Sequence, residues 1–571
     1  MSLTIMILRG SFSLPFLVCP PAFAIFASPP LRKAPLFMAQ KRYFDFHGPV
    51  FIPSALVVIL FVGLTLAIGK PAERFFADLQ TGLYDNVGWL FIFTMNALLI
   101  AALGLAFSPL GKIRLGGEKA TPEFSDFSWY SMLFSAGMGI GLVYFGVAEP
   151  IQHLIDPPAP VGSKVEAAKQ AFQFTFLHYG LHPWAAYGMV ALALAFFTFN
   201  KKLPLAIRSL FSPLLSRRIH GPLGSTVDTL AVVACLFGLA TTLGFGAKQL
   251  SSGLFYLFGL PDGINSQVII IAVVTLAATV SLVLGLDKGV RVLSEVNVKI
   301  AAAFLLGMLL LGPTVYLLDA FLENLGLYFQ NLIALSFYTE VYSEGDWQNN
   351  WTIFYYAWWI AWSPFVGIFI ARVSKGRTVK EFLIGVVLLP SLVSFFWLSV
   401  FGSSALYLEL NGTAPIGEAV AENSSTALFA MLGNYPLSKL MSFVGVLLIV
   451  GFFVTSSDSG SLVVDSLTSG GKLDAPVGQR IFWALAEGAL AATLLIGGGL
   501  VTLQTAVMLA SLPFAITLLV MTYSLILALR KERVKVVRRK VRRRQLRQAA
   551  KWEAHYREYL REEVESEEEI S

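Results

Sequence analysis

The feature that most constrains this chain is a series of apolar segments, each long enough to cross a lipid bilayer. A helix needs about 20 residues to cross roughly 30 Å of hydrocarbon. Twelve such segments lie near residues 50–69, 87–107, 127–147, 173–199, 227–258, 266–286, 295–318, 351–371, 380–407, 437–466, 479–498 and 504–529. Because backbone polar groups inside a bilayer must be satisfied by the protein itself, these segments predict an all-α polytopic membrane protein with twelve transmembrane helices.

Composition excludes the main alternatives. Of the 571 residues, 56% are hydrophobic and only 14% are charged, which excludes a string of soluble domains. Cys19 and Cys235 lie far apart and indicate neither a disulfide framework nor a metal cluster. Positive charge is concentrated in the tail, residues 530–571, which contains 14 Lys/Arg and 9 Asp/Glu. For a basic tail fixed to a membrane body, anionic lipid is a better partner than nucleic acid.

The loops between the segments alternate in positive charge. Lys and Arg are concentrated before the first segment and after every second one, and the alternate loops are poorer in them. Three of these alternate loops, 259–265, 319–350 and 408–436, carry none. Since cytoplasmic loops hold the excess of Lys and Arg, we expect both termini in the cytoplasm of a multi-pass protein of the cell (inner or plasma) membrane.

The N-terminal residues have some character of a secretory signal, with Arg9 before an apolar run at 12–26. Prolines interrupt this run, and a cleaved signal would reverse the orientation of every loop. We therefore expect residues 1–49 to form a partly disordered N-terminal extension, of which residues 1–37 are the disordered part or an overlong start before Met38.

The segment at 127–147 contains most of the most unusual stretch of the chain, FSAGMGIGLVYFGVAEP at residues 134–150. Gly137, Gly139 and Gly141 recur there at every second residue. Glycine in a helix interior costs about 1 kcal/mol relative to alanine, so this is the weakest helical point of the segment. Close helix packing is one interpretation of such a run. The other is a ligand site, because non-helical backbone at membrane depth needs protein or a water-filled cavity around it.

The segment at 351–371 reads, with Arg372 after it, WTIFYYAWWIAWSPFVGIFIAR. Pro364 is expected to break the hydrogen-bond ladder of this helix. Trp358, Trp359 and Trp362 cluster just before the proline. Two interrupted helices in corresponding halves of a chain point to a transporter site.

The two irregular segments are five segments apart in the chain, and five is an odd number. The second unit would therefore enter the membrane from the opposite side. This spacing predicts a transporter core at 50–529 in which two leading helices precede inverted repeats at about 127–318 and 351–529.

A third stretch, HYGLHPWAAY, opens the segment at 173–199. His178 and His182 are spaced like metal ligands on a helix, but no further histidine lies nearby, so we expect no metal site there. Tyr179, Trp184 and Tyr187 are more informative. They fit either an aromatic belt at the membrane surface or an aromatic cluster beside an interrupted helix.

A fourth stretch, GFFVTSSDSGS at 451–461, places hydroxyl groups and Asp458 inside an apolar segment. Hydroxyls can bond back to their own helix. An intramembrane carboxylate, however, is expensive and usually functional. We therefore favour ion handling over simple helix packing.

Two further segments lie outside the predicted spans. Residues 319–350 fit either an extracellular interfacial amphipathic helix or an ordinary extracellular loop. Residues 530–571 predict a long charged cytoplasmic helix, which is either a solvated stop-transfer tail or a regulatory element that meets anionic lipid. The count of basic residues exceeds what topology requires, so regulation is preferred.

Three motifs, taken in order, carry a resemblance to a known family. They are GMGIG at 137–141 followed by AEP at 148–150, WWIAWSPFVGIFIARVSKGR at 358–377, and TSSDSGS at 455–461. Together they resemble the betaine–choline–carnitine transporter family, most closely its sodium-coupled glycine betaine symporters. The resemblance implies a five-plus-five inverted-repeat fold with two extra leading helices, usually assembled as a homotrimer.

The resemblance also implies the substrate-binding residues. It assigns a box of aromatic rings to a quaternary ammonium, which cannot donate ordinary hydrogen bonds and is attracted to ring faces. Tyr179 stands where betaine symporters have tryptophan. The substrate carboxylate is expected at the backbone near the glycine run, and Trp362 as a gate or transient site. The implied set is Gly137, Met138, Gly139, Tyr179, Trp184, Tyr187, Trp358, Trp359 and Trp362.

Leu142 follows the glycine run where choline-specific relatives place an aspartate nearby, so a zwitterion is expected rather than choline. For the coupling ion, the resemblance implies a sodium site at Ser135, Met138, Phe452, Phe453, Thr455 and Ser456. A second sodium site in the family uses a phenylalanine, matched by Phe365, and two threonines, which are Cys235 and Leu239 here. Thiol and alkyl groups are poor ligands for a hard cation. The stoichiometry is therefore open, with Thr241 and Thr242 as nearby substitutes.

These interpretations predict sodium-coupled import of a zwitterionic compatible solute, with glycine betaine preferred, by osmotically regulated alternating access. Uptake or exchange of ectoine, proline, carnitine or choline, with different or no sodium coupling, is the alternative. No cofactor other than sodium is expected. An enzyme using His178, His182 and Asp458 lacks a paired base, nucleophile or metal set, and an aromatic box argues against a channel.

Overall fold

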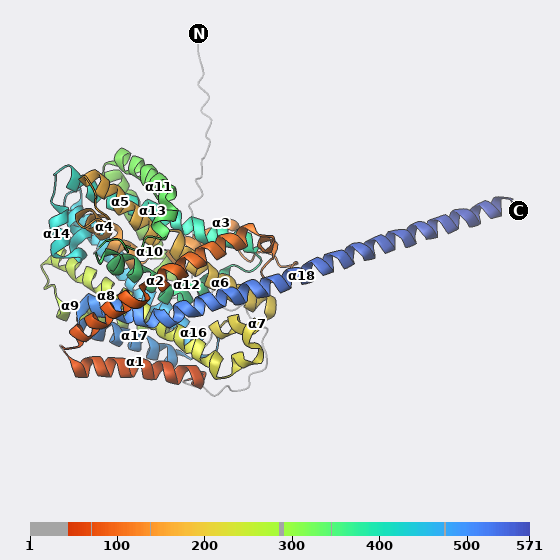
Figure 1. Cartoon of the computed structure of the whole chain (residues 1–571), viewed down its shortest axis with the longest axis horizontal. Coiled ribbons are helices and arrows are strands. Elements are labelled where there is room, and N and C mark those ends of the chain that lie inside the picture. The colour runs from red at the N-terminus through yellow and green to blue at the C-terminus, as the bar shows by residue number, and fades with distance from the viewer. Residues whose placement is uncertain are drawn as a thin grey trace, which may run out of the picture.

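A computed structural model describes residues 44–69, 71–137, 139–284, 290–343, 345–472 and 476–570, and for 134–137, 284, 290, 291 and 563–570 it describes the backbone only. These residues form a bundle of helices, and no β-strand occurs within the described ranges. Figure 1 shows the bundle with one very long helix, α18, leaving it toward the C-terminus.

The helices follow the apolar segments closely. Their bounds are α1 Gly48–Ile68, α2 Pro71–Phe107, α3 Asp126–Gly137, α4 Ile140–Ile155, α5 Lys164–Tyr179, α6 Leu181–Ala195, α7 Ser212–Leu215, α8 Pro222–Phe258, α9 Ile264–Leu284, α10 Val290–Leu311, α11 Thr314–Ser336, α12 Phe354–Val373, α13 Val379–Leu410, α14 Ile416–Glu422, α15 Ala427–Leu432, α16 Ser438–Thr468, α17 Val477–Ile496 and α18 Gly499–Ile570. In the described part of the chain, eleven spans are long and apolar enough to cross a membrane, with α5 and α6 counted as one. An all-α polytopic protein is confirmed, whereas the count of twelve and the inverted repeats stay predictions.

The predicted segment at 127–147 does not form a single long helix. It is divided into α3, which ends at Gly137, and α4, which begins at Ile140. Gly139 between them is fully extended, with φ −163° and ψ 179°. The helix therefore breaks inside the glycine run, where the sequence predicts its weakest point. Met138 lies outside the described residues.

A second interruption lies at Gly180, between α5 and α6, where the sequence analysis expected one unbroken segment. A Cβ atom at this position would lie 2.5 Å from the carbonyl oxygen of Phe176 and 2.5 Å from Cζ of Phe395. Only glycine fits so close to both. The helix is interrupted here, so α6 begins at Leu181 as a separate helix.

The predicted interruption at Pro364 is wrong. Helix α12 continues through this residue from Phe354 to Val373. Proline cannot donate to the carbonyl four residues earlier, which is that of Ile360. The hydroxyl of Ser363 donates to this carbonyl instead, at 2.7 Å. Because the orphaned acceptor is satisfied locally, the helix does not need to break.

Two further predictions concern segments outside the bundle core. Helix α11 covers Thr314–Ser336 rather than the whole of 319–350, and its place at the membrane surface stays a prediction. The C-terminal helix is present, and it is continuous with the last apolar segment because α18 runs from Gly499 to Ile570. Figure 1 shows its charged half projecting beyond the bundle.

The site lies where the two interrupted segments meet α8 and α12. Helix α12 packs extensively on α6 and also on α8, while α4 packs on α5, α8 and α13. Helix α13 starts with a capping box in which Thr378 and Glu381 each satisfy a backbone amide of the other. These contacts surround the gap at Gly139 with buried helices.

Candidate substrate site

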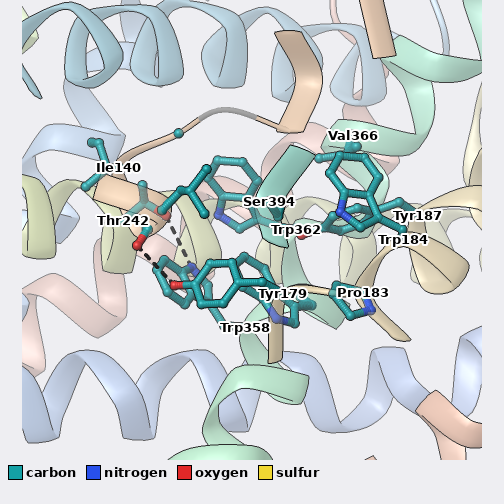
Figure 2. Close-up of a pocket in the computed structure, with 14 residues that line it drawn as sticks. Ile140, Tyr179, Pro183, Trp184, Tyr187, Thr242, Trp358, Trp362, Val366 and Ser394 are labelled. Carbon is teal, nitrogen blue, oxygen red and sulfur yellow. Dashed lines mark hydrogen bonds between the residues drawn. The ribbon is translucent and has the colours of Figure 1, made fainter. Parts of the chain in front are cut away.

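A cavity lies at the break between α3 and α4. Its lining combines backbone from that break with rings from α5, α6 and α12. The lining residues are Gly139, Ile140, Gly141, Leu142, Tyr179, Pro183, Trp184, Tyr187, Thr242, Trp358, Trp359, Trp362, Val366 and Ser394. In Figure 2, Ile140 and Thr242 lie at one side of the view and Trp184 and Tyr187 at the other.

The cavity is small and uncharged. Its volume is about 60 Å³, and a single water needs about 10–15 Å³ on the same measure. Among the described residues that line it, none carries a formal charge. The space suits a small solute and not a wide aqueous pore, and any charge on that solute must be met by rings, hydroxyls and backbone.

The aromatic side chains predicted from the sequence share this cavity. The exposed fractions of Tyr179, Trp184, Tyr187 and Trp359 are 5%, 4%, 4% and 8%. The ring centroid of Trp359 lies 5.5 Å from that of Tyr179 and 6.3 Å from that of Tyr187. The interplanar angles are 70° and 82°, so the ring is nearly perpendicular to both. An aromatic belt facing lipid would leave these rings exposed, so that interpretation does not apply to them.

The tryptophans of α12 form a second surface of the cavity. Trp358 and Trp359 stack in parallel, with ring centroids 4.9 Å apart and an interplanar angle of 9°. Trp358 Nε1 donates to Thr242 Oγ1 at 3.2 Å, which fixes its edge against α8 (Figure 2). Trp359 Nε1 donates to the carbonyl oxygen of His178 at 2.7 Å. Both indoles therefore present a face, and not a polar edge, to the space beside them.

Several polar groups at the cavity lack a partner in the described structure. Tyr187 Oη and Trp362 Nε1 are buried and have no hydrogen-bond acceptor or donor within reach among the described residues. The first amides of α4 have no partner inside that helix, as at any helix start, and Gly139, its N-cap residue, has no side chain to cap them. These donors are available to a ligand with an acidic end.

A buried polar cluster lies directly behind the aromatic wall. Glu149 Oε1 lies 2.6 Å from His178 Nδ1 and 3.2 Å from His153 Nε2. Tyr355 Oη donates to Glu149 Oε2 and lies 3.2 Å from Tyr179 Oη. The cluster thus connects a carboxylate on α4 to a ring that lines the cavity.

The cluster has the geometry of hydrogen bonds and not of a metal centre. Glu149, His153 and His178 bring one ligand atom each to within 4.8 Å of one another. Ligands of one tetrahedral zinc stand about 3.3 Å apart, from metal–ligand distances near 2.0–2.1 Å, and the 2.6 Å contact is much shorter. His178 and His182 do not converge either, because His182 Nε2 lies 3.3 Å from Asn96 Oδ1.

The residues proposed for a first sodium site are only partly described. Phe452, Phe453 and Thr455 are buried on α16, next to the half-buried Ser456. Thr455 Oγ1 donates to the carbonyl oxygen of Gly451 at 2.9 Å and accepts from Asn297 Nδ2 at 3.3 Å. The side chain of Ser135, and Met138 altogether, lie outside the described residues.

The α16 face with Phe453 approaches the break in the first interrupted segment. A Cβ atom added to Gly246 of α8 would lie 2.8 Å from Ile140 Cδ1 and 3.3 Å from Phe453 Cδ1. Ile140 is the first residue of α4. Phe453 and the first residue of α4 therefore both approach Gly246.

The residues at the second sodium position do not fit a hard cation. Cys235 and Leu239 are fully buried on α8 and offer no oxygen. The nearby hydroxyls donate within α8, from Thr241 Oγ1 to the carbonyl oxygen of Phe237 at 2.9 Å and from Thr242 Oγ1 to that of Gly238 at 3.0 Å. Thr242 Oγ1 also accepts from Trp358 Nε1, so Thr241 is the better supplied of the two with lone pairs for a cation.

Some residues of the region escaped the sequence reasoning. Tyr355 and Ser394 have no distinctive sequence context, and only the packing of α12 and α13 around the cavity reveals them. Thr242 was a candidate ion ligand, and the structure places it beside Trp358 at the cavity instead. Glu149 had a signal, because a carboxylate inside an apolar segment is costly. Asp458 is also fully buried, with Ser281 Oγ 2.9 Å from its Oδ2.

The fold and the cavity define a polytopic membrane protein with a small, uncharged cavity between interrupted helices. Comparison with known proteins places this class more narrowly. The family model for the betaine/carnitine/choline family of transporters matches residues 49–534, so the chain belongs to this family. It is a transporter and not an enzyme.

Characterised relatives cover most of the chain. A glycine betaine/proline/choline transporter of Vibrio parahaemolyticus is 45% identical over 86% of this chain and 91% of its own. Glycine betaine transporter 1 of the same organism is 46% identical over 86% and 96% of the two chains. The glycine betaine transporter OpuD of Bacillus subtilis is 44% identical over 80% and 89%.

Proposed function

We propose that this protein imports glycine betaine, or a closely related compatible solute, by sodium-coupled alternating access. The observation that carries the proposal is the cavity itself, which is walled by tyrosine and tryptophan rings and has no charged side chain among its described lining residues. A trimethylammonium group has no N–H to donate, and a desolvated ring face attracts it by about 2 kcal/mol. The names of the relatives point to the same solutes.

The acidic end of the solute is proposed to bind at the start of α4. The first two amides of α4, those of Ile140 and Gly141, have no carbonyl partner inside the helix, whereas the next two donate to the carbonyl oxygen of Gly139. The helix dipole adds partial positive charge. Gly139 and Gly141 have no side chain to keep a carboxylate away from this backbone, and both line the cavity. Trp362 also lines the cavity, and it is proposed as a gate because its indole nitrogen has no hydrogen-bond partner among the described residues.

For the ion, we propose one sodium at Thr455 and Ser456 together with Ser135, Met138, Phe452 and Phe453. Hydroxyl and carbonyl oxygens suit a hard cation, and the α16 face with Phe453 approaches the start of α4. A transporter with different or no sodium coupling, moving proline, ectoine, carnitine or choline, is the alternative, and the name of one relative includes proline and choline.

We propose that the C-terminal helix regulates transport in response to osmotic stress through anionic lipid. A cavity of about 550 Å³ lies beside it, lined by apolar residues and by Lys201, Lys531, Lys535 and Arg538. Basic pockets at a cytoplasmic surface attract anionic headgroups. The proposal includes cytoplasmic termini and, from the family resemblance, a homotrimer.

Transport by purified protein in proteoliposomes tests the proposal. Labelled glycine betaine, ectoine, proline, choline and carnitine are supplied with an inward sodium gradient and with an equal potassium gradient. We expect the highest initial rate for glycine betaine and a rate near background without sodium. Preference for proline or ectoine would overturn the substrate assignment, and equal rates in potassium would overturn the sodium coupling.

A further inference from the structure

The side chain at position 179 is the starting point. Tyrosine stands there instead of the tryptophan expected for a betaine symporter, and it brings a hydroxyl group into an otherwise apolar ring wall. Tyr179 Oη lies 3.0 Å from the carbonyl oxygen of Gly141 and 3.2 Å from Tyr355 Oη. An indole at 179 has no oxygen with which to make this pair of contacts.

The contacts continue away from the cavity to a carboxylate. Tyr355 Oη donates to Glu149 Oε2, and Glu149 Oε1 is held by His178 and His153. Tyr355, Glu149, His178 and His153 have exposed fractions of 0%. His178 is held in turn, with Nε2 2.9 Å from Thr352 Oγ1. The cluster is therefore a fixed anchor and not a loose surface pair.

The direction of the hydrogen bonds matters for the ring that meets the solute. Tyr355 gives its proton to Glu149, so Tyr355 Oη can act only as an acceptor toward Tyr179. The single hydroxyl proton of Tyr179 donates to the carbonyl oxygen of Gly141 at 3.0 Å and is shared with Tyr355 Oη at 3.2 Å, as a three-centre hydrogen bond. Hydrogen bonds in such a chain polarise one another. A phenol that donates toward a carboxylate is richer in electrons, and its ring face attracts a cation more strongly.

We propose that Glu149, acting through Tyr355, positions and polarises the ring of Tyr179 and thereby sets the preference of the cavity for a cationic solute. Glu149 and Tyr355 are positioning residues, since Glu149 lies outside the lining of the cavity and acts on the solute through Tyr179. The link offsets the weaker ring face of tyrosine relative to tryptophan. This inference rests on the proposed function, because it assumes a quaternary ammonium in the cavity.

Tyr355 has a neighbour that makes a matched control. Tyr356 lies on the same helix and is equally buried, with an exposed fraction of 0% for both. Its hydroxyl has no hydrogen-bond partner in the described part of the chain. Tyr355→Phe and Tyr356→Phe therefore remove the same atom from the same kind of environment, and only the first breaks the link to Glu149.

The probe pair is glycine betaine and 3,3-dimethylbutyrate, which has the same shape but carbon in place of the charged nitrogen. The measurement is the KM for betaine uptake in proteoliposomes and the inhibition constant of 3,3-dimethylbutyrate. In Tyr355→Phe we expect the KM to rise about 2–10-fold, the range for one lost hydrogen bond, with little change in maximal rate. Inhibition by the neutral-tailed isostere should stay the same. Tyr356→Phe should match the wild type in both.

The variant Tyr179→Trp is a second background, which distinguishes loss of the link to Tyr179 from general damage to the protein. The ratio compared is the inhibition constant of 3,3-dimethylbutyrate divided by the KM for betaine. In Tyr179→Trp the hydroxyl is gone, so adding Tyr355→Phe should have no further effect on this ratio. Glu149→Gln should lower the ratio in the wild-type background and not in Tyr179→Trp. Equal behaviour of Tyr355→Phe and Tyr356→Phe, or an undiminished effect in Tyr179→Trp, would overturn the inference. Absence of betaine uptake by the wild type would instead overturn the proposed function.

Discussion

The indole nitrogen of Trp359 donates to the carbonyl oxygen of His178 at 2.7 Å. This carbonyl belongs to the last turn of α5, where the break at Gly180 removes the amide that would otherwise bond to it. One side chain therefore satisfies the interrupted helix and presents a ring face to the cavity. The interruption and the aromatic wall depend on each other.

Replacing Trp359 separates these two contributions. Trp359→Leu removes the ring face and the hydrogen bond, so we expect uptake of glycine betaine to be abolished. Trp359→Phe keeps a ring but loses the donor, and should retain measurable uptake with a KM raised about fivefold, corresponding to roughly 1 kcal/mol. Initial uptake by intact cells, normalised to the amount of protein in the membrane, measures both. Unchanged uptake kinetics in Trp359→Leu would contradict the aromatic box.

The close approach at Gly180 predicts a loss of stability. A Cβ atom there would lie 2.5 Å from both Phe176 O and Phe395 Cζ, and overpacking of this kind costs about 1–3 kcal/mol. Gly180→Ala should therefore lower the melting temperature of the purified protein in lipid nanodiscs. Gly326→Ala is the control, because nothing lies within 4 Å of a Cβ at that position of α11. A melting temperature equal in the two variants would show that α5 and α6 can move apart.

The sequence was informative where the physics is local and silent where it depends on packing. Hydropathy located the eleven apolar spans of the described chain, and three alternating glycines located the break at Gly139, because both signals follow from the cost of backbone in lipid. Gly180 was not recognised, since a single glycine in an apolar segment is common and its role depends on Phe395 from another helix. Pro364 was misjudged because the rescue by Ser363 depends on a rotamer that the sequence does not specify.

The site shows the same division. The rings of Tyr179, Trp184, Tyr187 and Trp359 could be assigned from a family pattern, and the structure places them around one cavity. Tyr355 could not be assigned, because its hydroxyl matters only through the distance to Tyr179. Long-range pairs of this kind are set by the packing of α12 on α5 and leave no periodic pattern in the chain.

Ser363 and Pro364 should be coupled in their effect on stability. Ser363→Ala leaves the Ile360 carbonyl without its donor, and an unsatisfied buried acceptor costs about 1–3 kcal/mol. In the double variant with Pro364→Ala, the new amide at 364 can take that carbonyl, so the loss should be largely reversed. Thermal unfolding of the two single variants and the double variant gives the interaction energy. Additive effects would mean that the carbonyl has another donor, such as water.

The charged half of α18 is expected to control activation. It contacts the loop after α2, since Lys540 and Arg543 lie 3.8 and 3.5 Å from the carboxylate oxygens of Glu118. Deleting residues 533–571 should flatten the response of uptake to external osmolality while leaving the basal rate. Glu118→Gln should shift the response by a smaller amount, because each exposed pair is worth only about 0.2–1 kcal/mol. An unaltered osmotic response after the deletion would leave the tail as a topological signal.

The dependence on sodium tests how many ions the cavity region binds. Since Cys235 and Leu239 offer no oxygen, initial uptake should rise hyperbolically with sodium concentration, as for one site. Thr455→Ala should raise the half-saturating sodium concentration about tenfold, because a bond to a charged partner is worth about 1.5–3 kcal/mol. Ser457→Ala is the matched control: Ser457 is two residues further along α16, is also buried, and its hydroxyl has no partner among the described residues. Successive helical residues are turned by about 100°, so Ser457 points away from the face of Thr455 and its loss should leave the curve unchanged. A sigmoidal curve in the wild type would require a second sodium site outside the Cys235 position, and a shift in Ser457→Ala as large as in Thr455→Ala would remove the assignment to Thr455.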